Sequence, residues 1–249
     1  MSRSLFFVSS RAVLASALLV LGIVASRADG EADFLAGKTK SCVKCVLEKA
    51  QLKRRDLAGV DFSGANLTRA VFHRSRLIGA KFGDAELAGA NLNKTDLKNA
   101  SFTNANVQGG MFYESDLSVA NLTGANLMEA KMGKARLIRT IFDSAKLTEA
   151  ILTGARLDDA SLKGAELQRA NLIGVTLRRA NLEGANLEDS GLIDAVMREA
   201  NLKGANLSGA DLFGADLSES RLSRAILTDA KVDGVNFKGA LMPDGSTHE

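Results

Sequence analysis

From Leu52 to Met242 an apolar side chain occupies every fifth position without a break. The thirty-nine residues of this series are all Leu, Phe, Met or Val, and we call them central residues. Two positions before each centre lies a small residue, usually Ala, and Asn or Asp often stands between the two, as in Ala65-Asn66-Leu67. The chain is therefore a tandem repeat of five residues, with one large and one small apolar position in each repeat.

A period of five fits neither regular secondary structure. Residues five apart point about 140° apart on an α-helix, and they point to opposite faces on a strand. The chain must therefore bend once in each repeat, and equal bends in one sense close it into a coil. Gly is frequent at the second residue after the centre, as at Gly64 and Gly124, where a tight turn favours it. Coils stacked about 4.8 Å apart would bury the central and small residues inside.

The spacing of the central phenylalanines indicates the length of one coil. One set is separated by multiples of twenty residues: Phe62, Phe82, Phe102 and Phe142. A second set, Phe72 and Phe112, is offset from the first by ten residues. Four repeats per coil would stack the first set in one column and the second set in the opposite column. A ten-residue period also fits the same spacing.

The tandem A-(N/D)-L-x-x pattern resembles that of the pentapeptide-repeat proteins over about four fifths of the chain. The resemblance implies an all-β fold: a right-handed quadrilateral β-helix (solenoid) of about ten coils, with twenty residues per coil. We expect it over residues 42–243, between an N-terminal segment or cap (29–41) and a C-terminal tail (244–249). Arg55 occupies a small inward position, where an unpaired charge is costly, so the first coil is expected to be irregular or frayed.

Residues 1–28 have the three parts of a secretory signal peptide. Arg3 and Arg11 precede an uncharged apolar run from Ala12 to Ala25, and Ser26-Arg27-Ala28 offers small residues for cleavage. The run is shorter than the ~20 residues of a membrane-spanning helix. We therefore expect a periplasmic or secreted mature chain with no membrane span. The alternative is an uncleaved N-terminal segment that anchors the chain to the membrane.

Removal of the leader changes the charge of the protein. The whole chain has 32 basic and 29 acidic residues, and the leader contains three of the basic ones, Arg3, Arg11 and Arg27, and no acid. The mature chain is therefore formally neutral. This balance argues against a nucleic-acid partner and equally against an acidic mimic of DNA.

Few residues could carry catalysis. His73 and His248 are the only histidines, and the sequence contains no motif of nucleophilic, phosphate-binding or metal chemistry. We expect no enzymatic activity, no cofactor and no metal. Cys42 and Cys45 are the only cysteines. Their spacing looks like the Cys-x-x-Cys opening of exported family members, and in an oxidising compartment we expect a short structural disulfide rather than a redox site.

Sorting the outward residues by the twenty-residue period separates the surface into faces. The face built on Leu67, Leu87 and Leu127 is net acidic. The opposite face is rich in arginine: Arg136, Arg139, Arg156, Arg178, Arg179 and Arg198. A third face, named the mixed face, has its centres at residues 52, 72, 92 and every twentieth position onward. It begins basic and then carries three outward apolar residues that form one column at twenty-residue spacing, Ile173, Ile193 and Phe213, and Ile151 lies on the same face. These four residues are named the apolar ladder.

These features predict an exported, non-enzymatic binding or scaffold protein that offers a rod-like surface for protein–protein interaction. The six arginines and the apolar ladder are the candidate partner-binding residues, and the partner is an unidentified protein or the chain itself as a homodimer. For the ladder, a plain preference of these side chains for strand pairing is an equal alternative. For the whole chain, the alternative is a DNA-mimic inhibitor of type II topoisomerase, as in quinolone-resistance members of the family. The export signal and the neutral mature charge disfavour it.

Overall fold

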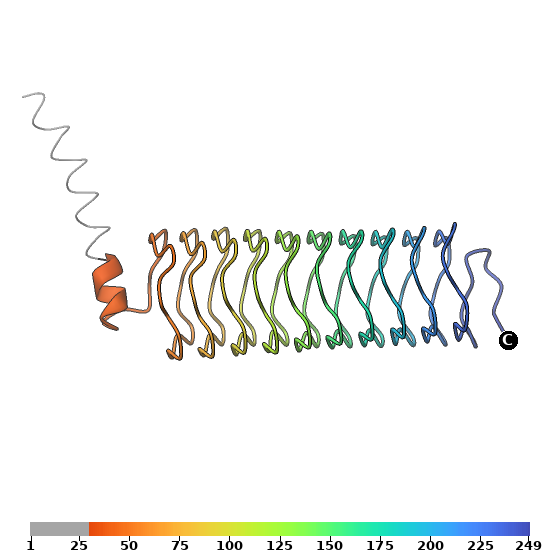
Figure 1. Cartoon of the computed structure of the whole chain (residues 1–249), viewed down its shortest axis with the longest axis horizontal. Coiled ribbons are helices and arrows are strands. Elements are labelled where there is room, and N and C mark those ends of the chain that lie inside the picture. Colours follow the sequence, from red (N-terminus) through yellow and green to blue (C-terminus); the bar gives the residue numbers. More distant parts are fainter. Residues whose placement is uncertain (1–29) are drawn as a thin grey trace, which may run out of the picture.

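The computed structural model describes residues 30–249. The expected signal peptide, residues 1–28, lies outside the described residues. The described chain consists of one short helix, residues 30–35, followed by a rod of stacked coils, as Figure 1 shows. Within this part of the chain, no helix is long and apolar enough to cross a membrane.

Parallel β-bridges join residues twenty positions apart along the rod. Every fifth residue from Ser41 to Arg221 forms such a bridge with the residue twenty positions later. The column that starts at Ser41 passes through ten bridges to reach Leu241. One coil therefore takes twenty residues, or four repeats, and the ten-residue period that the phenylalanine spacing left open is not adopted.

Each repeat satisfies its backbone groups in the same way. The central N–H donates forward to the next coil, as Phe62 N does to Lys81 O at 2.8 Å. The residue before the centre donates backward, as Asp61 N does to Lys40 O at 2.9 Å. A third bond closes a turn inside the repeat, from Ala65 N to Phe62 O at 2.9 Å. Because the pattern recurs with the sequence repeat, successive coils pair in register without any long strand.

The turn forces a positive φ on the second residue after each centre as far as Phe237, including Cys42 and Leu47, which continue the same phase before Leu52. From residue 44 to residue 239 this residue has a φ between +55° and +71° in each repeat. Glycine adopts this conformation at no steric cost, but twenty-five of these residues are not glycine. Among them Val119 has a φ of 63° and is the β-branched member, the type of side chain least suited to this region. The glycine preference seen in the sequence is therefore explained by the turn.

We expect Val119→Asn to stabilise the rod by about 1 kcal/mol, because Asn tolerates the left-handed region and Val does not. The matched control is Gly174→Val, at the same repeat position with a φ of 63°. A Cβ on Gly174 would meet no atom within 4 Å, so the loss of about 1–2 kcal/mol expected there reports the backbone alone. Urea unfolding of both variants measures the two changes. Equal stabilities in all three proteins would contradict the turn geometry.

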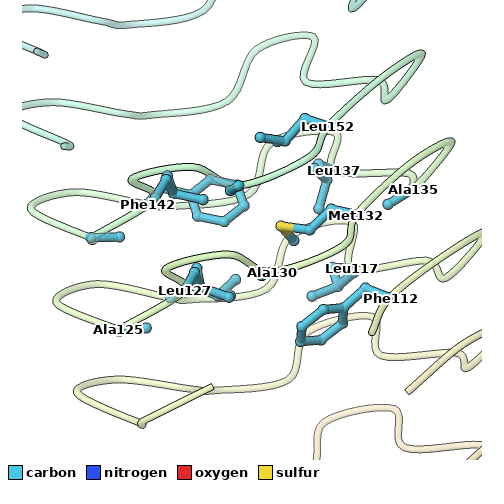
Figure 2. Packing of buried hydrophobic residues seen from close by; sticks show 14 of the residues in the cluster. Phe112, Leu117, Ala125, Leu127, Ala130, Met132, Ala135, Leu137, Phe142 and Leu152 are labelled. Carbon is cyan, nitrogen blue, oxygen red and sulfur yellow. The ribbon is translucent and has the colours of Figure 1, made fainter. Parts of the chain in front are cut away.

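The core is a continuous stack of central and small residues. Figure 2 shows Phe112, Met132 and Leu152 stacked in one column, with alanines beside the centres. The rings of Phe62 and Phe82 stack at 5.4 Å between centroids, and those of Phe82 and Phe102 stack at 4.5 Å. The phenylalanine columns expected from the sequence are thus present. The large and small positions fill the interior together, because each layer places alanines beside its bulky centres.

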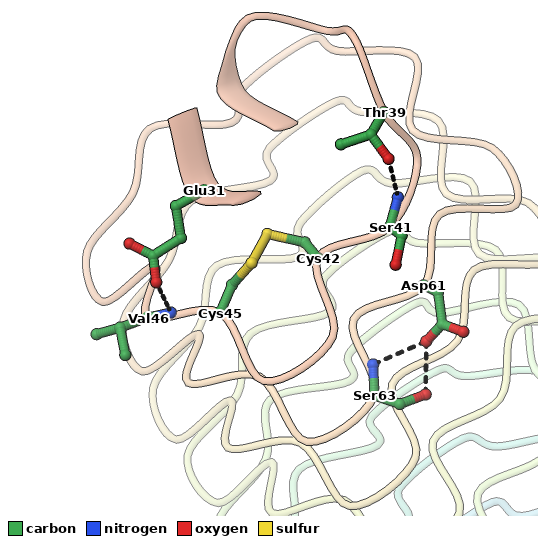
Figure 3. Close-up of a disulfide and its surroundings, with 8 residues drawn as sticks. All are labelled: Glu31, Thr39, Ser41, Cys42, Cys45, Val46, Asp61 and Ser63. Carbon is green, nitrogen blue, oxygen red and sulfur yellow. Dashed lines mark hydrogen bonds between the residues drawn. A yellow bond between two sulfur atoms is a disulfide. The ribbon is translucent and has the colours of Figure 1, made fainter. Parts of the chain in front are cut away.

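The N-terminal end of the rod is covered, and the expectation of a frayed first coil is wrong. Phe34 of the short helix is buried and packs edge-on against Phe62, with ring centroids 5.2 Å apart. The Arg55 side chain is half-buried but not unpaired, because its guanidinium donates to Leu35 O at 2.9 Å and lies over the Phe34 ring at 5.8 Å. Glu31 accepts the otherwise unpaired N–H of Val46 at 2.6 Å (Figure 3). The helix therefore caps the first coil.

The last coil departs from the expectation that all centres are buried. Val232 is 44 % exposed, and three other late centres, Leu227, Phe237 and Met242, are only partly buried. The reason is that no further coil stacks on them. The segment after Met242 turns back instead, where Leu241 and Thr247 form an antiparallel bridge. This C-terminal segment covers only part of the end of the core.

Candidate binding surfaces

The apolar ladder lies on consecutive coils of the mixed face. The carbonyls of Ile173, Ile193 and Phe213 accept hydrogen bonds from the turns of the preceding coils at 2.9, 2.9 and 3.0 Å. Ile151, Ile173 and Phe213 are 41, 36 and 55 % exposed, and Ile193 is half-buried. The ladder is therefore an outward apolar strip held by a rigid backbone. Outward apolar residues are common when single, but a contiguous strip is less so.

The surroundings of the ladder leave it uncovered. A Cβ placed on Gly174 would meet nothing within 4 Å, and one on Gly191 would meet only Ile173, at 3.9 Å. The ladder is thus flanked by glycines, which have no side chains to cover it. Asp194 is the exposed charged residue next to Ile193. The side chains of Ile and Phe are consequently the main features of this part of the mixed face.

The arginine-rich face is occupied by ion pairs within the rod. Arg179 donates to both carboxylate oxygens of Asp159, at 2.7 and 2.9 Å, from the coil directly after it. Hydrogen bonds from Arg179 hold the pKa of Asp159 below its usual value. Four further candidates also have a carboxylate within 4.0 Å: Arg136, Arg156, Arg178 and Arg198. Only Arg139 among the six has no ion pair of this length in the described part of the chain, so this face is less available to a partner than its sequence suggests.

The two cysteines lie inside the first coil. Their sulfurs are bonded at 2.13 Å, and both side chains are buried (Figure 3). Cys42 takes a central position and Cys45 the small position three residues later, so the bond lies across one turn. The pair is placed where a structural clip would hold the end of the rod, next to the capping helix.

We expect the exported protein to contain the Cys42–Cys45 disulfide. Mass spectrometry of the non-reduced mature chain should show a mass lower by two hydrogens than that of the reduced chain. Reduction should cost about 2 kcal/mol or less, because the closed loop is short. Two free thiols in freshly isolated protein, blocked at once with an alkylating reagent, would contradict this expectation.

The described residues show no group of three or more His, Cys, Asp or Glu side chains that could hold a metal ion. His73 lies in a shallow hollow at the basic start of the mixed face, among residues that the sequence did not single out together. A signal for this hollow existed, because its residues recur at twenty-residue intervals. His248 lies against Phe237, with ring centroids 5.8 Å apart, at the end of the rod.

A rod of twenty-residue coils with its side chains sorted into columns defines a β-solenoid repeat protein. The family model of pentapeptide repeats matches successive stretches from residue 45 to residue 242: 45–84, 80–118, 112–143, 120–159, 140–179, 177–214 and 205–242. The chain therefore belongs to the pentapeptide repeat family. Comparison with curated proteins returns no match.

Several solved structures of the family are similar to the chain. HetL, a pentapeptide repeat protein involved in heterocyst differentiation regulation in the cyanobacterium Nostoc, is 28% identical over 87% of this chain and 96% of its own, with a TM-score of 0.44. A pentapeptide repeat protein of the Arabidopsis thaliana thylakoid lumen is 31% identical over 51% of this chain and 71% of its own, with a TM-score of 0.25. QnrB1, a plasmid-mediated fluoroquinolone resistance protein, is 17% identical over 75% of this chain and 88% of its own, with a TM-score of 0.42.

Proposed function

We propose that this chain is an exported, non-enzymatic binding protein, and that the apolar ladder of the mixed face is its main contact with a protein partner. The observation that carries the proposal is the exposure of Ile151, Ile173 and Phe213 on one strip of a rod whose other faces carry paired charges. The proposal takes the coil as right-handed and four-sided, as family membership implies, so that the mixed face is flat. The partner is a foreign protein or a second copy of this chain.

The export part of the proposal rests on the leader. Arg3, Arg11 and the apolar run after them have the order of a signal peptide, and the buried Cys42–Cys45 bond suits an oxidising compartment. N-terminal sequencing of the protein from a periplasmic or culture fraction should begin at Asp29. Recovery of the intact chain from the cytoplasmic fraction alone would contradict export.

The charge distribution gives no support to a DNA mimic. Such a protein needs a continuous acidic surface, whereas several acidic residues of this rod are paired with a base in an adjacent coil. Glu149 and Arg169 lie in adjacent coils at 2.7 Å, and Asp211 and Lys231 do so at 3.0 Å. These pairs cancel one another locally, which favours a protein-binding role over imitation of a polyanion.

The decisive experiment replaces Ile173, Ile193 and Phe213 with serine together. We expect the triple variant to stay folded and to lose its partner, seen as a lower sedimentation coefficient or as the absence of captured protein. The matched control is Val119→Ser, Ile141→Ser and Ile226→Ser, which removes three exposed apolar side chains from other faces. If the ladder variant keeps both its oligomeric state and every captured partner, the ladder serves only strand pairing.

A further inference from the structure

The basic start of the mixed face differs from the rest of the rod in the order of its charged residues. Elsewhere, cations in one coil commonly face carboxylates in the next, as Arg76 faces Asp56 at 3.0 Å. At the second residue after the centre, however, the first three coils of the mixed face carry Arg54, Arg74 and Lys94 in succession. No other outward column of the described chain has three successive cations.

The backbone holds these cations close together. Arg54 N donates to His73 O, and Arg74 N donates to Asn93 O, each at 3.1 Å. Neighbouring coils lie about 4.8 Å apart, so the like charges face one another across a short distance, which is unfavourable unless an anion lies between them. Neither Arg54 nor Arg74 has an ion pair within the described residues, whereas Lys94 has one with Glu114 at 3.2 Å.

Beside this column lies the hollow that contains His73. It is lined by six residues of the same three coils: Lys53, Arg54, Val71, His73, Asn91 and Asn93. None of them is acidic. In the repeats that flank the first of these coils, the carboxylates of Glu48 and Asp56 are already paired with Lys49 and Arg76 at 2.9 and 3.0 Å. The positive charge of the hollow is therefore not neutralised by the protein itself.

The side-chain oxygens of the two asparagines of the hollow each accept a backbone N–H. The Asn91 side-chain oxygen accepts the N–H of Asn93 at 3.1 Å, and the Asn93 side-chain oxygen accepts the N–H of Tyr113 at 2.7 Å. These bonds fix the amide orientation and leave both side-chain NH₂ groups as free donors. Together with the cations Lys53 and Arg54, they make the hollow rich in hydrogen-bond donors, and the His73 ring and Val71 complete its lining.

We propose that this hollow binds an oxyanion of the phosphate class, and that the Arg54, Arg74 and Lys94 column extends the site to a ligand with several such groups in line. A phosphate has several acceptor oxygens and does not require an acceptor from the protein. It therefore suits a site in which three coils supply hydrogen-bond donors. Arginine forms paired hydrogen bonds to such groups. The site is separate from the apolar ladder, so either proposal can fail while the other holds.

The test measures binding of orthophosphate and of tripolyphosphate to the mature chain by calorimetry at low salt. Tripolyphosphate should bind more tightly than orthophosphate, and added salt should weaken both. The double variant Arg54→Asn with Arg74→Asn should bind tripolyphosphate at least about tenfold more weakly, since two charge-assisted contacts are lost. Asn tolerates the positive φ of both positions.

The matched control is Arg221→Asn with Arg224→Asn, which removes the same charge from exposed arginines near the other end of the rod. It should bind tripolyphosphate as the parent does. Absence of binding to the parent, or equal weakening in the two double variants, would overturn the proposal and leave only a general effect of charge. Binding to vesicles that contain phosphatidic acid identifies the source of the phosphate. If the chain binds these vesicles and the binding depends on Arg54 and Arg74, the phosphate belongs to a lipid headgroup. If the chain binds tripolyphosphate but not the vesicles, the phosphate belongs to a soluble ligand.

Discussion

Replacing Phe82 with alanine should lower the free energy of unfolding by about 3–5 kcal/mol. Phe82 is fully buried and lies between two other rings, with centroid distances of 5.4 Å to Phe62 and 4.5 Å to Phe102. The coils above and below are fixed by backbone hydrogen bonds, so they cannot move together to fill the space. The variant therefore loses the transfer free energy of the ring and keeps a cavity.

The control is Phe82→Leu. Leucine already occupies the same column at Leu122 and Leu162, so it fits the layer and should cost less than about 1.5 kcal/mol. Urea unfolding followed by circular dichroism measures both variants. A cost below about 1 kcal/mol for the alanine variant would mean that this column is not closely packed.

Replacing Phe34 with alanine should destabilise the first coils by about 3–4 kcal/mol, close to the usual cost of a buried phenylalanine. The ring covers the end of the core against Phe62, and the guanidinium of Arg55 lies over it. Repeat proteins unfold from weakened ends, because each repeat contacts only its neighbours. The loss should therefore appear first near Cys42, Leu47 and Leu52 rather than along the whole rod.

Amide hydrogen exchange measures this difference. In the Phe34 variant the amides of Leu47 and Leu52 should exchange faster, while those of Leu162 and Leu182 keep their parent rates. Leu35→Ala is the control, because Leu35 is an exposed residue of the same helix. Uniform acceleration along the chain would show that the helix supports the whole rod and is not a local cap.

The phase of the repeat was sufficient to predict which residues are buried. A central or small residue is recognised by counting in fives, and its surroundings repeat with it, so Leu127 and Ala130 could be placed inside without any tertiary information. The ends could not be placed in this way. Arg55 violates the pattern, and its partners, Phe34 and Leu35 O, belong to a helix outside the repeat.

The surface was predictable only in part. Its columns follow from the twenty-residue period, and the Asp159–Arg179 pair could have been read from the sequence by comparing residues twenty apart. The orientation of the side chains could not be predicted from the sequence in this way. The amide orientations of Asn91 and Asn93 are set by neighbouring backbone N–H groups that donate to their side-chain oxygens. The exposure of Val232 depends on how the chain continues after the last coil, and the repeat does not encode that path.

The twenty-residue coil is tested most directly by cross-linking. Ser101 and Asn121 form a parallel bridge, so cysteines at these two positions lie within the range of a disulfide. Ser101→Cys with Asn121→Cys should cross-link within one chain under mild oxidation, as peptide mass spectrometry would show. Ser101→Cys with Met111→Cys, half a coil apart, should not. A cross-link in the second pair and none in the first would contradict the twenty-residue coil.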